Sequence, residues 1–245
     1  MESIFEKRLT VTPDYCDASG ALSPLAAFTI FQGIAAQHAE VLGVGSSVMA
    51  KKGEFWLTVH TRVDLFERAY LMDELTVRTW AEACSERDVR TYRSYTLSRG
   101  EAVIARGKTE WAILGPEQKI IRFGDSGFPK DPFPAETAIP EKLQRFHEKF
   151  EDADLFSHYA VRSTDIDLGH HMNNVAYVRL LLDCFSAKEL ASGNIQSVEL
   201  HYSTPCFEGE ALTVYKKSLD DGTCRIGIVK PDGKTASQAC VTFKK

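Results

Sequence analysis

A short polar cluster, followed at once by an apolar helical pattern, is the part of this 245-residue chain that could do chemistry. Within ten residues it holds two carboxylates, two imidazoles and two side-chain amides: Asp165, Asp167, His170, His171, Asn173 and Asn174. Apolar residues at helical spacing follow from Val175 to Leu182, so the cluster is expected at a helix N-terminus. Unpaired backbone N–H groups there favour developing negative charge. A carboxylate and an imidazole in that position could activate a water or polarise a carbonyl.

A simpler interpretation is that one asparagine caps the helix and that the histidines are solvated. For a single asparagine the two interpretations are about equally good. One cap does not need so many polar groups, so the sequence favours a catalytic cluster.

Composition excludes several classes of protein. Hydrophobic residues make up 44% and charged residues 26% of the chain, which are ordinary values for a globular protein. The net charge of -5 argues against a general nucleic-acid binder, which carries a basic footprint. No apolar run approaches the roughly 18 residues of a membrane-spanning helix, and the N-terminus has no apolar signal core. We therefore expect a cytoplasmic protein with no nucleic-acid partner and no membrane span.

The six cysteines are scattered without a CxxC pair, at positions 16, 84, 184, 206, 224 and 240. This spacing predicts reduced thiols, most of them small core residues, rather than a disulfide frame or a zinc site. Neither a metal nor a cofactor is expected.

The elements that must position the cluster occur twice in the chain. Asp17 and Asp167 stand 150 residues apart, and each follows a strand-like run and precedes an apolar helix. Further along, Leu75–Val77 matches Leu212–Val214 at an offset of 137 residues. The matches are weak one by one, and their common order predicts an internal repeat.

Each half is expected to have the order strand, helix and then several strands, with the helices at about residues 23–42 and 173–191. In the first long strand, at 55–65, one face carries Phe55, Leu57, Val59, Thr61, Val63 and Leu65. Long amphipathic strands favour antiparallel sheets with one covered face. The sequence predicts an α+β fold in which two antiparallel sheets each wrap around a central helix.

A proline-rich joint connects the halves. Four prolines fall in the segment from Gly124 to Pro140, where they oppose both helix and sheet. Pro140 is expected to begin a short charged helix that runs through Glu151. The expected division is an N-terminal unit at 1–123, the joint at 124–155, and a C-terminal unit at 156–245.

The segment Asp165-Ile-Asp-Leu-Gly-His-His-Met-Asn-Asn-Val-Ala-Tyr177 resembles the D-x-D-x-N-x-H-x-N-N-x-x-Y motif of acyl-ACP thioesterases, which release fatty acids from acyl carrier protein (ACP). Two first-half segments, Trp56–Phe66 and Asp73–Trp80, also look like that family. The resemblance covers nearly the whole chain. It implies a tandem (double) hotdog fold and a hydrolase of fatty acid biosynthesis whose partner is ACP.

The resemblance also assigns roles. Asp167 matches the family's catalytic aspartate and His171 its catalytic histidine, in a register fixed by Asn173 and Asn174. Asn173 is included among the catalytic candidates, and Asn174 among those that bind substrate. The family's catalytic asparagine is replaced here by Gly169, which could let the backbone approach the substrate.

Two further positions bear on the mechanism that the resemblance implies. Pro205 stands where the family has a glutamate, and Cys206 matches a cysteine once assigned as nucleophile. A buried inert cysteine is the more common case, so we expect Cys206 to be dispensable. His170 is an extra imidazole that could substitute in part for the missing groups.

The first half keeps Asp17 but lacks the other polar residues, so it is expected to shape the acyl pocket. Phe28 and Phe31, on the apolar face of its helix, and Trp56 are the expected contacts of the acyl chain, with simple packing on the sheet as the alternative. Two other functions stay open: an acyl-CoA thioesterase or other hotdog enzyme, and a non-catalytic acyl-binding protein. Single hotdogs usually work as dimers, so a homodimer is also considered.

Overall fold

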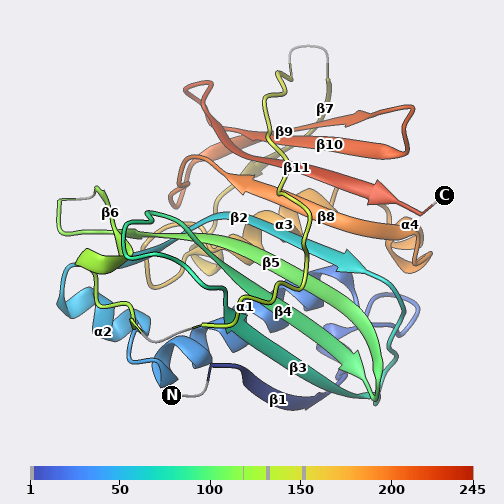
Figure 1. Cartoon of the computed structure of the whole chain (residues 1–245). Coiled ribbons are helices and arrows are strands. Elements are labelled where there is room, and N and C mark those ends of the chain that lie inside the picture. The colour runs from blue at the N-terminus through green and yellow to red at the C-terminus, as the bar shows by residue number, and fades with distance from the viewer. Residues whose placement is uncertain (1–2, 118, 131–132, 151–152, 245) are drawn as a thin grey trace.

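The computed structural model describes residues 3–117, 119–130, 133–150 and 153–244. Within these residues an antiparallel sheet of 11 strands runs through both halves of the chain (Figure 1). The first half contributes, in spatial order, β1 (Phe5–Thr10), β3 (Glu74–Ala81), β4 (Thr91–Arg99), β5 (Ala102–Leu114) and β2 (Phe55–Leu65), and the short β6 (Ile120–Ile121) pairs with β5. The second half continues with β8 (Ile195–Tyr202), β11 (Thr235–Phe243), β10 (Thr223–Val229), β9 (Ala211–Ser218) and β7 (Asp154–Ala160).

The two expected sheets are joined edge to edge. β2 pairs antiparallel with β8, with His60 opposite His201 at one end and Asp64 opposite Ser197 at the other. Read from its outer edge, each half has an equivalent strand order, β1-β3-β4-β5-β2 and β7-β9-β10-β11-β8. The repeat that the sequence predicted is therefore present in the topology, and edge pairing merges its two sheets into one.

The helices lie on one face of the sheet (Figure 1). α1 (Pro24–Val41) packs on β3 and against α3 (Asn174–Leu182). Each helix begins at a polar cap, because the Ser23 side chain accepts from the Ala26 N–H and the Asn173 side chain from the Val175 N–H. The second helix is shorter than expected: α3 ends at Leu182, and α4 (Ala187–Ala191) follows after a break. The short α2 (Ser46–Lys51) lies between α1 and β2 in the chain.

A β-bulge in β2 changes which face its residues occupy. The pairing of β2 with β5 shifts by one residue between Thr58 and His60. Thr58 and Thr61 consequently both line the space under the helices, whereas Phe55 and Leu57 are 50% and 37% exposed. The expected alternation of this strand on one face is wrong, because one extra residue moves the side chains beyond it to the other face.

The helix expected between Pro140 and Glu151 is also wrong. Residues 141–150 form neither helix nor strand, and Glu151 lies outside the described residues. The segment instead crosses the sheet face opposite the helices as an extended strap (Figure 1).

Contacts at every second residue explain the extended strap. The Gln144 N–H donates to Glu199 Oε1 over 2.5 Å. The Phe146 ring lies 5.4 Å from the His60 ring, and the Phe150 ring lies 6.3 Å from that of Tyr215. An extended chain turns alternate side chains to one side. Both phenylalanines therefore reach the sheet, as does Glu148, which pairs with Arg225. Between them His147 and Lys149 are exposed.

No helix among the described residues is both long and apolar enough to cross a membrane.

Candidate functional site

The polar cluster forms a tight loop between the 3₁₀-helix η3 (Ser163–Asp165) and α3. The Asp167 N–H donates to the His171 carbonyl over 3.1 Å, and the His170 N–H donates to the Asp167 carbonyl over 3.0 Å. His170 closes this turn in the left-handed region, with φ of 59°. The Met172 N–H then donates to the Cys206 carbonyl over 2.8 Å, which fixes the loop to the segment after β8.

Asp167 is held by two donors. Its Oδ1 accepts from the Gly169 N–H over 2.8 Å, and its Oδ2 accepts from Asn173 Nδ2 over 3.2 Å. The side chains of Asp167 and His171 are 28% and 39% exposed, and Asp167 Oδ1 lies 4.0 Å from His171 Nδ1. That separation is too long for a hydrogen bond. The structure thus brings Asp167, His171 and Asn173 together at a partly exposed site, with the two catalytic candidates close but not bonded.

Both catalytic candidates pack closely against Gly169. A Cβ at this position would lie 2.8 Å from His171 Nε2 and 3.1 Å from Asp167 Oδ1. His171 Nδ1 lies 3.3 Å from the Met172 carbonyl oxygen. If Nδ1 carries the proton and donates to that carbonyl, Nε2 is the free acceptor of the ring. His171 Nε2 and Asp167 Oδ1 therefore both border Gly169, and a side chain at this position would displace them.

The other carboxylate of the cluster is structural. Asp165 is buried and accepts from the Tyr159 hydroxyl over 2.6 Å and from the Arg162 N–H over 2.9 Å, and it forms an ion pair with Arg179. Burial alone would raise the pKa of Asp165, but these hydrogen bonds and the guanidinium outweigh it and hold the pKa below its usual range. Asp165 consequently anchors η3 beneath the loop.

A side chain from the first half completes the site. Gln32 of α1 donates from Nε2 to Asn173 Oδ1 over 3.3 Å, and the same oxygen accepts from the Val175 N–H over 2.8 Å. Asn173 therefore has its carbonyl directed at Gln32 and the helix, and its amide nitrogen at Asp167. Gln32 was not among the predicted site residues, because nothing along the chain relates it to Asn173, 141 residues away.

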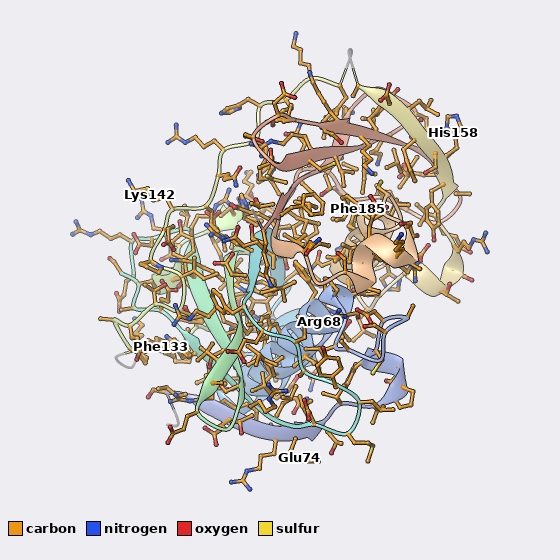
Figure 2. The ribbon with its side chains drawn as sticks, turned by 90° about the vertical axis from the view of Figure 1, so that its right-hand side faces the viewer. Arg68, Glu74, Phe133, Lys142, His158 and Phe185 are labelled. Carbon is orange, nitrogen blue, oxygen red and sulfur yellow. The ribbon has the colours of Figure 1, made fainter. Side chains whose placement is uncertain are left out.

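The first half contains the same loop, with its carboxylate in an ion pair. The Asp17 N–H donates to the Ala21 carbonyl, and Asp17 Oδ1 accepts from the Ser19 N–H, as the second-half loop does at the equivalent positions. Asp17 Oδ2 is paired with Arg68. Arg68 also donates to the Ala191 carbonyl, and Figure 2 shows it between the two halves. The ion pair engages the Asp17 carboxylate, and the hydrogen bond from Arg68 to Ala191 joins the two halves.

Within the described part of the chain, no arginine or lysine pairs with Asp167. At the 137-residue offset the position equivalent to Arg68 is Pro205, which has no charge. The same loop therefore carries a neutralised carboxylate in the first half and an available one in the second.

Cys206 contributes through its backbone. Its side chain is fully buried, and burial raises the pKa of the thiol, which disfavours the thiolate that a nucleophile requires. Its N–H donates to the Tyr177 hydroxyl over 3.0 Å, while its carbonyl holds Met172. Cys206 therefore ties the loop to α3.

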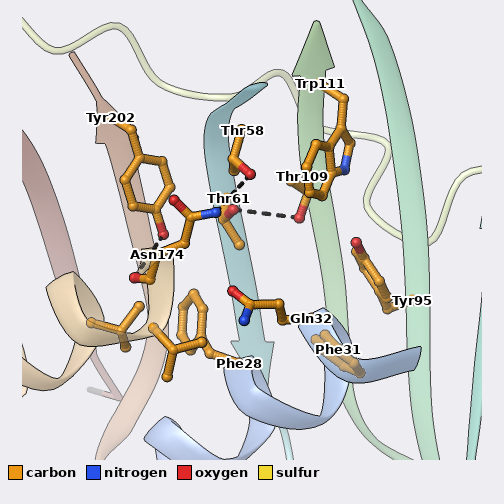
Figure 3. Close-up of a pocket in the computed structure, with 12 residues that line it drawn as sticks. Phe28, Phe31, Gln32, Thr58, Thr61, Tyr95, Thr109, Trp111, Asn174 and Tyr202 are labelled. Atoms are coloured by element: carbon orange, nitrogen blue, oxygen red, sulfur yellow. Dashed lines mark hydrogen bonds between the residues drawn. The ribbon is translucent and has the colours of Figure 1, made fainter. Parts of the chain in front are cut away.

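A narrow cavity of about 30 Å³ lies where α1 and α3 meet the sheet (Figure 3). Phe28, Phe31 and Asn174, three of the residues expected to bind substrate, line it, and Asn174 Nδ2 donates to Thr58 Oγ1 over 2.8 Å. The remaining lining residues are Gln32, Thr58, Thr61, Tyr95, Thr109, Trp111, Val175, Val178 and Tyr202. Gly107 carries no side chain, which lets the Phe31 ring lie against β5: a Cβ there would meet it at 2.7 Å.

Two expected site residues lie elsewhere. Trp56 packs in a second apolar cluster with Phe123 and Phe128, and its Nε1 donates to the Val44 carbonyl over 2.8 Å. The centre of its ring lies 5.8 Å from that of Trp111, which belongs to the cavity wall. His170 is exposed at the tip of the loop. Among the described residues no group of three or more His, Cys, Asp or Glu side chains could hold a metal ion.

Comparison with known proteins matches both halves of the chain. A family model described as the acyl-ACP thioesterase N-terminal domain matches residues 2–122, and one described as the C-terminal domain matches residues 147–245. The oleoyl-acyl carrier protein thioesterase of Coriandrum sativum is 21% identical over 230 residues, which are 85% of this chain and 61% of that protein. The chain thus spans about six tenths of the length of this plant relative.

Two solved structures share the fold. An acyl-ACP thioesterase from Bacteroides thetaiotaomicron superposes with a TM-score of 0.87 at 20% identity, covering 99% of this chain and 98% of that chain. The 12:0-ACP thioesterase from Umbellularia californica gives 0.86 at 17% identity, covering 100% and 98%. At such identities the likeness shows a common fold, and the large antiparallel sheet with few helices is a hotdog-like arrangement.

Proposed function

The chain belongs to the acyl-ACP thioesterase family, and from this premise we propose that it hydrolyses acyl-ACP thioesters and releases free fatty acids. The observation that carries the proposal is the paired loop. One copy holds an available carboxylate beside an imidazole at a helix N-terminus, and the other holds its carboxylate in an ion pair.

We also propose that each half is one hotdog unit of a tandem hotdog. The units are 1–123 and 156–245, with 124–155 as the joint. The equivalent strand orders, the paired helices and the repeated loops support this division.

In the proposed mechanism the attacking water lies between His171 Nε2 and Asp167 Oδ1, the two groups that border Gly169. There His171 Nε2 acts as general base and takes one proton, while Asp167 Oδ1 accepts the other hydrogen and orients the water. The water oxygen then attacks the thioester carbonyl carbon. Collapse of the tetrahedral intermediate breaks the C–S bond, and the proton on His171 passes to the leaving thiolate of the carrier.

The negative charge on the carbonyl oxygen would be stabilised at the N-terminus of α3. In the first turn of α3 the Val175 N–H donates to Asn173 Oδ1 and the Ala176 N–H donates to the Asn173 carbonyl, so the proposed donor is the N–H of Asn174, where α3 begins beside the cavity. This gives Asn174 a substrate-binding role through its backbone as well as its amide. The exposed His170 and the buried thiol of Cys206 have no step in this mechanism.

Gln32 is a positioning residue in this scheme. It orients the Asn173 amide, which in turn holds Asp167. Because the cavity is close to the volume of one water, an acyl chain can enter only if Phe28, Phe31 or their neighbours move.

The test is a hydrolysis assay on acyl-ACP and acyl-CoA of matched chain length. We expect acyl-ACP to be hydrolysed faster, and Asp167→Asn or His171→Ala to lower kcat about 10²–10⁴-fold. Gln32→Leu, which keeps the size but not the donor, should lower kcat about tenfold with little change in KM. His158→Ala is the control, because this exposed residue of β7 has its Nδ1 3.4 Å from Thr213 Oγ1, and among the described residues no hydrogen bond or ion pair joins it to the loop residues Asp167–His171. Variants that stay folded and hydrolyse at the parent rate would show that the site lies elsewhere.

A further inference from the structure

The cavity wall combines hydrocarbon with one group of hydrogen-bonding side chains. Phe28 and Phe31 of α1 and Val175 and Val178 of α3 present only carbon. The strands opposite them contribute Tyr95 of β4 with Thr109 and Trp111 of β5. Figure 3 shows the Tyr95 hydroxyl directed toward the Trp111 ring. An alkyl chain packs against the carbon surface and cannot form hydrogen bonds with the polar side chains.

These polar groups are poorly satisfied by one another. Trp111 Nε1 is buried and has no hydrogen-bond partner of normal geometry, although the Tyr95 hydroxyl is near enough to interact with it. Thr109 Oγ1 reaches Thr61 Oγ1 only over 3.4 Å. Burial raises the pKa of Tyr95, so its hydroxyl keeps its proton and stays a donor.

An unpaired buried donor lowers stability, and folded proteins keep few of them without a functional reason. Trp111 Nε1 can only donate, so its missing partner must be an acceptor. None of the twelve lining residues is a cation. The buried Arg93, which interacts with Tyr95, is already engaged. Its Nη1 donates to Thr79 Oγ1 over 3.3 Å and lies 2.9 Å from His38 Nδ1. The lining therefore favours a neutral oxygen over a carboxylate.

One residue, Gln32, links the cavity to the proposed active site. Gln32 lines the cavity and also donates to Asn173 of the loop. An acyl chain whose thioester lies at Asp167 and His171 would therefore pass the wall that carries Tyr95, Thr109 and Trp111.

We propose that this protein prefers acyl chains that carry a keto or hydroxyl oxygen, which accepts hydrogen bonds from Trp111 Nε1 and the Tyr95 hydroxyl. The inference rests on the proposed function and names the substrate class of the same site. It assigns Trp111 and Tyr95 as specificity residues.

The test compares acyl-ACPs of one chain length that are unsubstituted, 3-hydroxy, 3-oxo or hydroxylated in mid-chain. We expect kcat/KM for at least one oxygenated chain to exceed that of the unsubstituted chain about tenfold or more, since a site built for a polar group rejects the analogue that lacks it. Trp111→Phe and Tyr95→Phe should each bring this ratio toward one. Trp80→Phe is the matched control, because it removes a buried indole N–H that donates to the Glu136 carbonyl outside the cavity, and it should keep the ratio.

Binding of the corresponding free acids, measured by calorimetry, gives a second readout that needs no catalysis. Tighter binding of an oxygenated acid in the parent but not in Trp111→Phe supports the proposal. Equal treatment of plain and oxygenated chains, or a preference that both phenylalanine variants keep, overturns it. If no thioester is hydrolysed, the proposed function fails, and the comparison of free acids still decides this inference.

Discussion

The close packing of His171 against Gly169 gives the sharpest test of the proposed mechanism. In Gly169→Ala the new Cβ would lie 2.8 Å from His171 Nε2, whereas nonbonded contacts of carbon normally lie at about 3.5 Å. The imidazole must therefore move by roughly 0.7 Å or more. A displacement of about 1 Å in a catalytic group can cost about 10²-fold in rate, so we expect kcat to fall about 10–100-fold.

The fold should tolerate this change. The His171 side chain is 39% exposed and can turn toward solvent, and φ of Gly169 lies outside the left-handed region. We expect the unfolding free energy to change by no more than about 0.5 kcal/mol, as for other surface substitutions. Gly33→Ala is the control, because a Cβ there has no neighbour within 4 Å, and it should leave kcat unchanged.

The assay is steady-state hydrolysis of acyl-ACP together with a thermal unfolding curve for each variant. Parent-level kcat in Gly169→Ala would refute the placement of the water beside Nε2. A loss of kcat matched by a large loss of Tm would show instead that the glycine serves the fold. Gly169→Asn, which restores the family's residue, distinguishes a need for space from a need for an amide: we expect it to be at least as impaired as the alanine variant.

Three further predictions follow from the site. Cys206→Ser should keep most activity, and mass spectrometry should find no acyl adduct on the parent's Cys206; an adduct would reverse the assignment. Asp165 has a lowered pKa in the folded state, so its stabilisation is present above the unfolded pKa near 4 and is lost as pH falls through the folded pKa. Asp165→Asn should therefore lower the unfolding free energy by about 2 kcal/mol at pH 7, with the difference from the parent shrinking in acid; an equal difference at pH 7 and pH 2 would contradict this. Phe31→Ala should shift the product profile toward longer chains at nearly unchanged kcat, and an unmoved profile would remove the first half from length selection.

The sequence by itself determined the features that depend on neighbours along the chain. The caps at Ser23 and Asn173, the helix starts that follow them and the tight polar loop are encoded locally, and the structure contains all three. The internal repeat was also readable, because two copies of one supersecondary pattern keep their order even when single matches are weak.

Tertiary structure alone decided the features that depend on distant partners. The bulge that turns both Thr58 and Thr61 toward the cavity arises from the pairing of β2 with β5. The strap at 141–150 is extended because alternate residues, among them Phe146 and Phe150, contact the sheet, whereas its local proline and charge pattern predicted a helix. Gln32 reaches Asn173 only because α1 and α3 pack together. The difference between a paired and an available carboxylate rests on one position, Arg68 against Pro205, and that contrast has meaning only when the fold places the position beside the loop.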